Sequence, residues 1–174
     1  LELEPACVLF GWPVYWSQYL VARDSDIYVL GDLEGKTWAY PDAGSTSGFI
    51  VPSVELQAAG IEPGEGVEAG GHNQAVLAVY NGEVDFATSF YSPPIMPGAQ
   101  WDFGDLPEPY DLTIDEAYIN DEGRLYVGDI RIMDSRSGVR ETAPDVVDKV
   151  RILRVSDPIP NDTMSFGPGF PADL

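Results

Sequence analysis

Three hydroxyl side chains stand in a row in this sequence, on Ser45, Thr46 and Ser47, within the segment 41–48 that reads Pro-Asp-Ala-Gly-Ser-Thr-Ser-Gly. The first turn of a helix has backbone N–H groups without partners inside the helix, and its peptide dipoles give it partial positive charge. Hydroxyl donors at such a turn, with Gly48 allowing close approach to the backbone, would hold a small oxyanion without Lys or Arg. The alternative is that one hydroxyl only caps a helix.

The residues on either side of this segment predict the elements that the site requires. Residues 36–40 are short and β-favouring, which predicts a strand. Residues 49–60 carry apolar side chains at helical spacing and end in Gly60, a common C-terminal stop. Segment 41–48 is therefore expected to be a strand-to-helix turn.

A second loop-to-helix junction lies at residues 70–73 and contains the only histidine, His72. Residues 74–80 favour a helix, and residues 83–87 predict the next strand, with Asp85 late in it. This alternation of strands and helices predicts an α/β fold with a mostly parallel sheet. Ligands on such sheets sit beyond the carboxyl ends of the strands, where segment 41–48 and His72 both fall.

Composition limits the partners of the chain. Its 174 residues include 9 basic and 29 acidic ones, and the net charge of −20 argues against nucleic acids and anionic membranes. Any bound anion must therefore be held by local dipoles and short hydrogen bonds. Cys7 has no second cysteine, and one Cys with one His cannot build a zinc cluster, so neither a metal nor a cofactor is expected. Residues 1–6 lack the basic start of a signal peptide, so localisation is not visible in this chain.

Residues 91–135 depart from the regular alternation of strands and helices. Their Pro and Gly content predicts a long loop over residues 89–113. Residues 112–119 and 124–127 then flank a turn, which predicts a β-hairpin. The region therefore looks inserted into the α/β fold.

Five short motifs follow one another along the chain: Asp-Leu-Glu-Gly-Lys at 32–36, Ser-Thr-Ser-Gly at 45–48, Gly-His-Asn-Gln-Ala-Val at 71–76, Asn-Gly-Glu-Val-Asp at 81–85 and Ser-Asp-Pro-Ile-Pro-Asn at 156–161. In this order they resemble the phosphate/phosphite/phosphonate-binding proteins of ABC importers, a branch of the type II periplasmic binding proteins. Each motif alone is weak, whereas five in register are fairly specific. The resemblance covers about residues 14–90 and 146–165.

This resemblance implies an α/β three-layer sandwich with a mostly parallel central sheet, in a protein of two lobes that hold the anion between them. The chain, residues 1–174, resembles the second lobe, with hinge or crossing segments at 1–32 and 156–174 and an insertion at 91–135. The implied function is that of a solute-binding component. Its implied partners are a phosphate-, phosphite- or phosphonate-class anion, ABC permease subunits and the missing first lobe. The implied location is periplasmic or extracellular, with membrane anchoring in the full-length protein.

The resemblance also implies ligand contacts at matching positions, which are Ser45, Thr46, Ser47, Gly48, His72, Asp85 and Tyr15. The three hydroxyls match the helix start that holds phosphoryl oxygens, and His72 matches the histidine that opens the next helix. Asp85 matches an acid that accepts a proton or pairs with an amine on the ligand. Tyr15 stands where an aromatic residue of the crossing strand lines the pocket.

Two other functions stay open at this point. The acidic insertion and its hairpin would suit a protein-interaction module on a degenerate binding lobe. A hydrolase would need Ser45 or Ser47 together with His72 and Asp85. Because residues 44–48 place Thr at the centre of the Gly-x-Ser-x-Gly pattern, no enzyme activity is expected.

Overall fold

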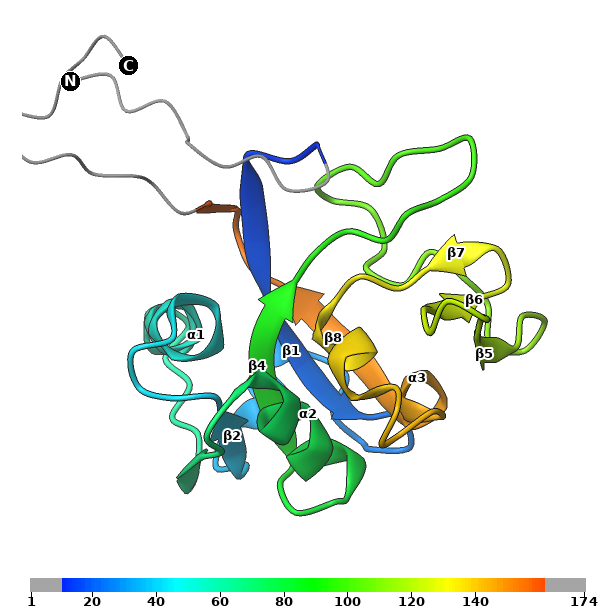
Figure 1. Ribbon diagram of the computed structural model, residues 1–174. Coiled ribbons are helices and arrows are strands. Elements are labelled where there is room, and N and C mark those ends of the chain that lie inside the picture. Colours follow the sequence, from blue (N-terminus) through cyan, green and yellow to red (C-terminus); the bar gives the residue numbers. More distant parts are fainter. Residues whose placement is uncertain (1–10, 162–174) are drawn as a thin grey trace, which may run out of the picture.

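A computed structural model describes residues 11–161 of the chain and places a six-stranded sheet at its centre (Figure 1). The main strand order is β3-β2-β4-β1-β8, and β9 pairs with β1. Strands β3 and β4 are parallel to β2, whereas β1 is antiparallel to both β4 and β8, so four of the five strands in this order point the same way. The strands are β1 (Val14–Ala22), β2 (Trp38–Tyr40), β3 (Gly66–Glu68), β4 (Phe86–Tyr91), β8 (Val150–Val155) and β9 (Ile159–Pro160). The predicted α/β fold with a mostly parallel sheet is confirmed.

Helices cover both faces of the sheet, which gives three layers (Figure 1). On one face lie α2 (His72–Tyr80), the 3₁₀ helix η3 (Ser135–Val139) and α3 (Val146–Lys149). On the other lie the π-helical turn η2 (Thr46–Ile50), α1 (Val51–Ala58) and the 3₁₀ helix η1 (Leu30–Leu33). No helix within residues 11–161 is long and apolar enough to cross a membrane.

Strand β1 shows how the sequence builds two hydrophobic layers. Its side chains alternate between the faces of the sheet, because successive residues of a strand point in opposite directions. Trp16 and Leu20 join the core cluster beneath α2, whereas Tyr19 and Val21 join the cluster beneath α1. All four are buried, as expected for a central strand covered on both sides.

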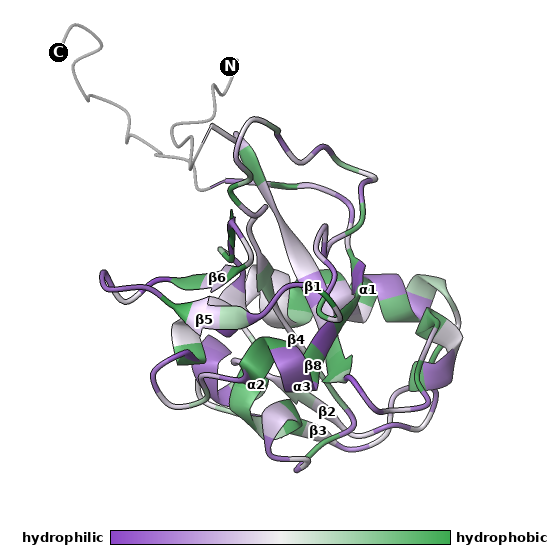
Figure 2. Cartoon of the chain, turned by 90° about the vertical axis from the view of Figure 1, so that its right-hand side faces the viewer, coloured by the Kyte–Doolittle hydropathy of each residue, from purple (hydrophilic) through white to green (hydrophobic). Residues whose placement is uncertain are grey.

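A small second sheet lies beside the main one. It contains β5 (Ala117–Ile119), β6 (Leu125–Val127) and β7 (Ile130–Arg131), with antiparallel pairs β5–β6 and β6–β7. Figure 2 shows the hydrophilic turn between β5 and β6 projecting from the body of the molecule. The predicted hairpin is confirmed, and β7 extends it by one strand.

The start of β4 differs from the sequence prediction. The strand expected over 83–87 is β4, which begins at Phe86, so Asp85 precedes the strand and the expectation that it lies late in it is wrong. The cause is the end of α2, where Glu83 N–H still donates to the carbonyl of Ala78 (2.8 Å) and postpones the extended chain. The parts of the expected hinge segments at 1–10 and 162–174, with Cys7, lie outside the described residues.

Candidate functional site

The edge at the carboxyl ends of β2, β3 and β4 brings together most of the candidate residues. Segment 41–48 follows β2, and the loop after β3 leads into α2. Backbone hydrogen bonds join the two loops, from Ala69 N–H to the carbonyl of Tyr40 (2.8 Å) and from Gly70 N–H to that of Pro41 (2.9 Å). The helix starts at Thr46 and at His72 therefore lie on the same edge.

Segment 41–48 forms a wide helical turn, in which two amides have no partner among residues 11–161. The Ser45 hydroxyl accepts a hydrogen bond from Gly48 N–H (3.1 Å). The backbone carbonyl of Ser45 accepts from the N–H groups of both Phe49 and Ile50 (2.9 and 3.0 Å). Within residues 11–161, the N–H groups of Thr46 and Ser47 have no hydrogen-bond partner. Such amides at a helix start are suited to an anion.

The hydroxyls of this turn differ in their surroundings. The Thr46 side chain is exposed, so it is accessible to a ligand from solvent. Ser47 is only 4 % exposed, and in the described part of the chain its hydroxyl has no hydrogen-bond partner. The Ser47 oxygen itself keeps contact with solvent, so its hydroxyl is available to donate to a ligand.

Gly48 has a structural reason to be glycine. A methyl group on its Cα would stand 2.3 Å from Cδ of Pro41 and 2.8 Å from the Ser45 hydroxyl oxygen. The sequence suggested that Gly48 leaves room for a ligand. In the fold, that room is filled by the proline ring, which packs the turn against the end of β2.

His72 is held by a residue that the sequence did not single out. Its Nδ1 lies 2.8 Å from the hydroxyl of Ser89 on β4, and its ring contacts Phe90 edge to face at 5.1 Å between centroids. Burial lowers the pKa of His72, while the negative charge of Asp42 opposes that shift. The imidazole is therefore neutral at pH 7. The sequence does not predict this role of Ser89, because nothing in the strand pattern marks its hydroxyl as the partner of His72.

Tyr15 lies at the same edge as segment 41–48 and His72. Strand β1 is antiparallel to β4 and pairs its Trp16 with Tyr91, so the start of β1 meets the carboxyl end of β4. Tyr15 pairs with Ile159 of β9 and is half-buried. Its contact with a ligand stays a prediction.

Asp85 lies at the opposite edge of the sheet. Its carboxylate accepts hydrogen bonds from the N–H and the hydroxyl of Thr37 (2.8 and 2.7 Å), directly before the parallel strands β2 and β4 begin. The Thr37 hydroxyl accepts in turn from Asp85 N–H (2.9 Å). The structure therefore does not bring Asp85 to His72, and a Ser-His-Asp arrangement is not assembled.

Asp85→Asn is expected to lower the free energy of unfolding at pH 7 by about 1 kcal/mol, since a hydrogen bond to a charged acceptor becomes a neutral one. The hydrogen bond from the Thr37 hydroxyl, with that from Thr37 N–H, lowers the pKa of Asp85. Its contribution is therefore present above the ordinary carboxyl value of about 4 and is lost as the pH falls through the lower folded value.

Urea unfolding at pH 7 and at pH 3 measures this effect. The difference between wild type and Asp85→Asn should shrink at the lower pH, and Asp129→Asn, at an exposed position, serves as the control. Equal losses in the two variants at pH 7 would contradict the role of Asp85 as the tie between β2 and β4.

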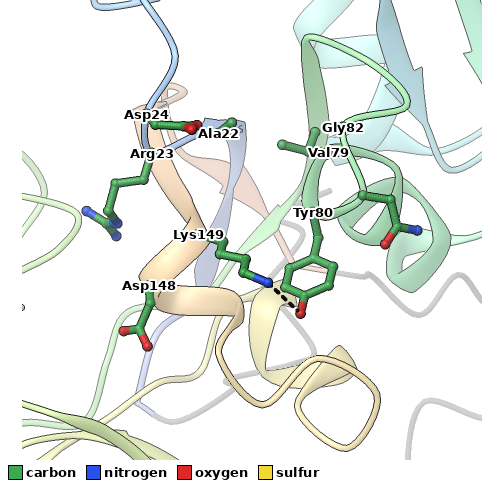
Figure 3. Close-up of a pocket in the computed structure, with 9 residues that line it drawn as sticks. Ala22, Arg23, Asp24, Val79, Tyr80, Gly82, Asp148 and Lys149 are labelled. Carbon is green, nitrogen blue, oxygen red and sulfur yellow. Dashed lines mark hydrogen bonds between the residues drawn. The ribbon is translucent and has the colours of Figure 1, made fainter.

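A large cavity is separate from these residues. It has a volume of about 550 Å³ and lies where β1 ends and β8 begins, at the same edge as Asp85 (Figure 3). Its cations already have partners: Lys149 Nζ lies 3.2 Å from the Tyr80 hydroxyl and 3.0 Å from Asp145, and Arg23 pairs with Glu108 (3.1 Å). Residues 11–161 also contain no group of three or more His, Cys, Asp or Glu side chains able to hold a metal ion.

Comparison with known sequences gives consistent matches. A model of the family described as ABC transporter, phosphonate, periplasmic substrate-binding protein matches residues 8–174. The phosphate-import protein PhnD of Mycolicibacterium smegmatis is 29% identical over 166 residues, which cover 84% of this chain and 45% of that protein. The phosphonates-binding periplasmic protein of Escherichia coli is 38% identical over 86 residues, 45% of this chain and 25% of that protein. The chain thus spans less than half the length of these curated relatives.

Solved structures agree in fold. XAC2383 from Xanthomonas citri, bound to ATP, matches with a TM-score of 0.56 and 18% identity over 92% of this chain and 46% of its own. A binding protein component of an ABC phosphonate transporter from Pseudomonas aeruginosa matches with a TM-score of 0.52 and 19% identity over 86% of this chain and 38% of its own. At these identities the likeness shows the fold alone.

Proposed function

Because this chain belongs to the family of periplasmic substrate-binding proteins of phosphonate ABC transporters, we propose that it binds a small phosphate- or phosphonate-like oxyanion at the edge formed by Thr46, Ser47 and His72. The observation that carries the proposal is the pair of N–H groups on Thr46 and Ser47, which are flanked by hydroxyls and have no hydrogen-bond partner in the described part of the chain. Those groups lie on the same edge as His72 and are the donors that an anion needs.

Binding without a cation suits the charge of this chain. With a net charge of −20, the protein repels an anion at long range. Short hydrogen bonds from amides and hydroxyls act only at contact and recognise the shape of the oxyanion. Neutral His72 adds a donor through Nε2 when the Ser89 hydroxyl donates to Nδ1. The site therefore selects by geometry, and the solute leaves without a strong ion pair to break.

The fold and the lengths of the relatives support a wider proposal. The chain forms one lobe of a type II periplasmic binding protein, and closure of a second lobe over the carboxyl edge completes the site. The bound solute is then delivered to ABC permease subunits, and the longer protein is anchored to the membrane. The described parts of segments 1–32 and 156–174 belong to the crossing segments, and residues 91–135 form an insertion. A single lobe offers half of the contacts, so its affinity is expected to be weak.

A titration followed through backbone amides tests this function. The ¹⁵N-labelled chain is titrated with phosphate, phosphite and methylphosphonate, with chloride at equal ionic strength as the control. The amide signals of Thr46 and Ser47 are expected to shift with at least one of the three anions, because these N–H groups become hydrogen-bond donors. Chloride should leave them unchanged. Absence of a specific shift with all three anions would overturn the proposal.

Thr46→Ala is expected to weaken anion affinity about five- to tenfold, because one hydrogen bond to a charged group is lost. The free energy of unfolding should stay within about 0.5 kcal/mol, since the side chain is exposed and has no partner within residues 11–161. Thr142→Ala, at an exposed position after η3, is the matched control and should leave the affinity unchanged. An ester-hydrolysis assay on both variants separates binding from catalysis, since turnover that depends on Thr46 would contradict a binding role.

A further inference from the structure

The anion-binding turn contains two carbonyl groups that each lose one of their helical hydrogen-bond donors. In an α-helix the carbonyl of residue i accepts from the N–H of residue i+4, and in a π-helix from that of residue i+5. Residue 52 is proline and has no N–H. The carbonyl of Gly48 therefore has no donor at the α-helical spacing, because residue 52 is four positions further on. The carbonyl of Ser47 has none at the π-helical spacing, because residue 52 is five positions further on.

The central strands supply the missing donors. The Ser17 hydroxyl, on β1, donates to the carbonyl of Ser47, and the Thr88 hydroxyl, on β4, donates to the carbonyl of Gly48. Ser17 and Thr88 are fully buried on the face of the sheet beneath η2 and α1. Neighbouring positions of that face carry large apolar side chains such as Tyr19 and Phe86, so two hydroxyls there need a specific reason.

The direction of the Thr88 hydroxyl is fixed by a third residue. The indole N–H of Trp38, on β2, donates to the Thr88 oxygen (2.8 Å), so the hydroxyl proton is free to point only at Gly48. Ser17 is fixed through its backbone, since its N–H donates to the Ser156 hydroxyl and its carbonyl accepts from Ser156 N–H, both at 2.9 Å. Both donors are thus pre-oriented before any ligand arrives.

The hydrogen bonds of the turn show what this arrangement does. Val51 N–H donates to the carbonyl of Thr46, five residues earlier, which is the π spacing. The turn continues directly into α1, so the two form one helix whose first turn is widened. With Ser47 and Gly48 tied to the sheet, the free N–H groups of Thr46 and Ser47 point away from the helix at the carboxyl edge.

We propose that Ser17 and Thr88 are positioning residues for the anion site, which hold the π-helical turn open by donating to the two carbonyls that each lose a helical donor at Pro52. The inference rests on the proposed function, because it explains how the amides that bind the anion are held. Neither residue touches the anion. Both act through the backbone of the turn.

The test compares variants that lose the hydroxyl with variants that keep it. Ser17→Ala and Thr88→Val are measured against Ser17→Thr and Thr88→Ser by amide titration with methylphosphonate and with phosphate. Loss of either hydroxyl is expected to weaken affinity about five- to tenfold, and the variants that keep it should stay within about twofold of wild type. Without ligand, the amide signals of Thr46 and Ser47 should already be displaced in the two variants that lose the hydroxyl. The two variants that keep it should show the wild-type signals.

The outcomes distinguish this inference from the proposed function. Wild type that shows no anion-dependent shift would overturn both. Wild type that binds, together with a folded Ser17→Ala of unchanged affinity, would overturn the inference alone. If Thr88→Val fails to fold, Ser17→Ala still tests the inference, because the backbone hydrogen bonds between residue 17 and Ser156 remain in that variant. Equal weakening by Ser17→Ala and Ser17→Thr would also overturn it, since the hydroxyl would not be the cause.

Discussion

Arg136→Met is expected to lower the free energy of unfolding by about 3–5 kcal/mol, the cost of removing one partner from a buried ion pair. Arg136 lies in η3 and is fully buried. Its guanidinium contacts the carboxylates of Asp134 (3.0 Å) and Glu108, and it also donates to the Tyr110 hydroxyl (2.9 Å). Methionine fills a similar volume, but it leaves the carboxylates without this cation.

The surroundings keep this arginine charged inside the protein. Burial acts to lower the pKa of Arg136, but Asp134, Tyr110 and Glu108 together raise it above the ordinary value. Glu108 also accepts from Arg23, and so one carboxylate ties the loop before β5 to the end of β1 and to η3. Loss of Arg136 should therefore loosen the region 91–135 as well as the core.

Arg124→Met is the matched control for this prediction. Arg124 also pairs with a glutamate, Glu122, but the two side chains are 46% and 61% exposed, and such pairs contribute about 1 kcal/mol or less. Urea unfolding at pH 7 measures the loss of unfolding free energy in each variant. The two losses are compared with the same dependence of the free energy on urea concentration. A loss in Arg136→Met no larger than that in Arg124→Met would show that the buried cluster contributes nothing specific to this fold.

The sequence predicts the parts of the fold that depend on local pattern. Strand β1 lies at residues 14–22, where apolar and aromatic side chains are dense, and segment 41–48 joins a strand to a helix as expected. His72 begins α2 because the two glycines before it, Gly70 and Gly71, end the preceding extended segment. These features follow from turn chemistry and periodicity, which act over a few residues.

The remaining parts depend on contacts that no short pattern encodes. The antiparallel position of β1 between β4 and β8 is set by pairing over long sequence distances. Ser17 and Thr88 look like ordinary strand residues until the sheet places them under the turn. The expected position of Asp85 is wrong because the turn after α2 runs three residues beyond Asn81-Gly82, to Asp85, which places the acid at the far edge of the sheet.

Gly48→Ala is expected to weaken anion affinity about tenfold or more and to lower the free energy of unfolding by about 1–3 kcal/mol, as overpacking does in a closed site. The added methyl would meet Cδ and Cγ of Pro41 at 2.3 and 2.5 Å, which is closer than carbon atoms approach without displacement. A proline ring cannot rotate away, so the backbone of the turn must move. That movement displaces the amides of Thr46 and Ser47 from the positions that Ser17 and Thr88 fix.

Gly44→Ala separates this clash from a general effect of alanine in the turn. Its methyl would meet only a carboxylate oxygen of Asp42, at 3.2 Å, and a flexible side chain can yield by that amount. We therefore expect Gly44→Ala to leave both affinity and stability near the wild-type values, as measured by amide titration with methylphosphonate and by urea unfolding. If Gly48→Ala binds as well as Gly44→Ala, the geometry of the turn is not what holds the anion, and the amides of Thr46 and Ser47 lose their role as the binding donors.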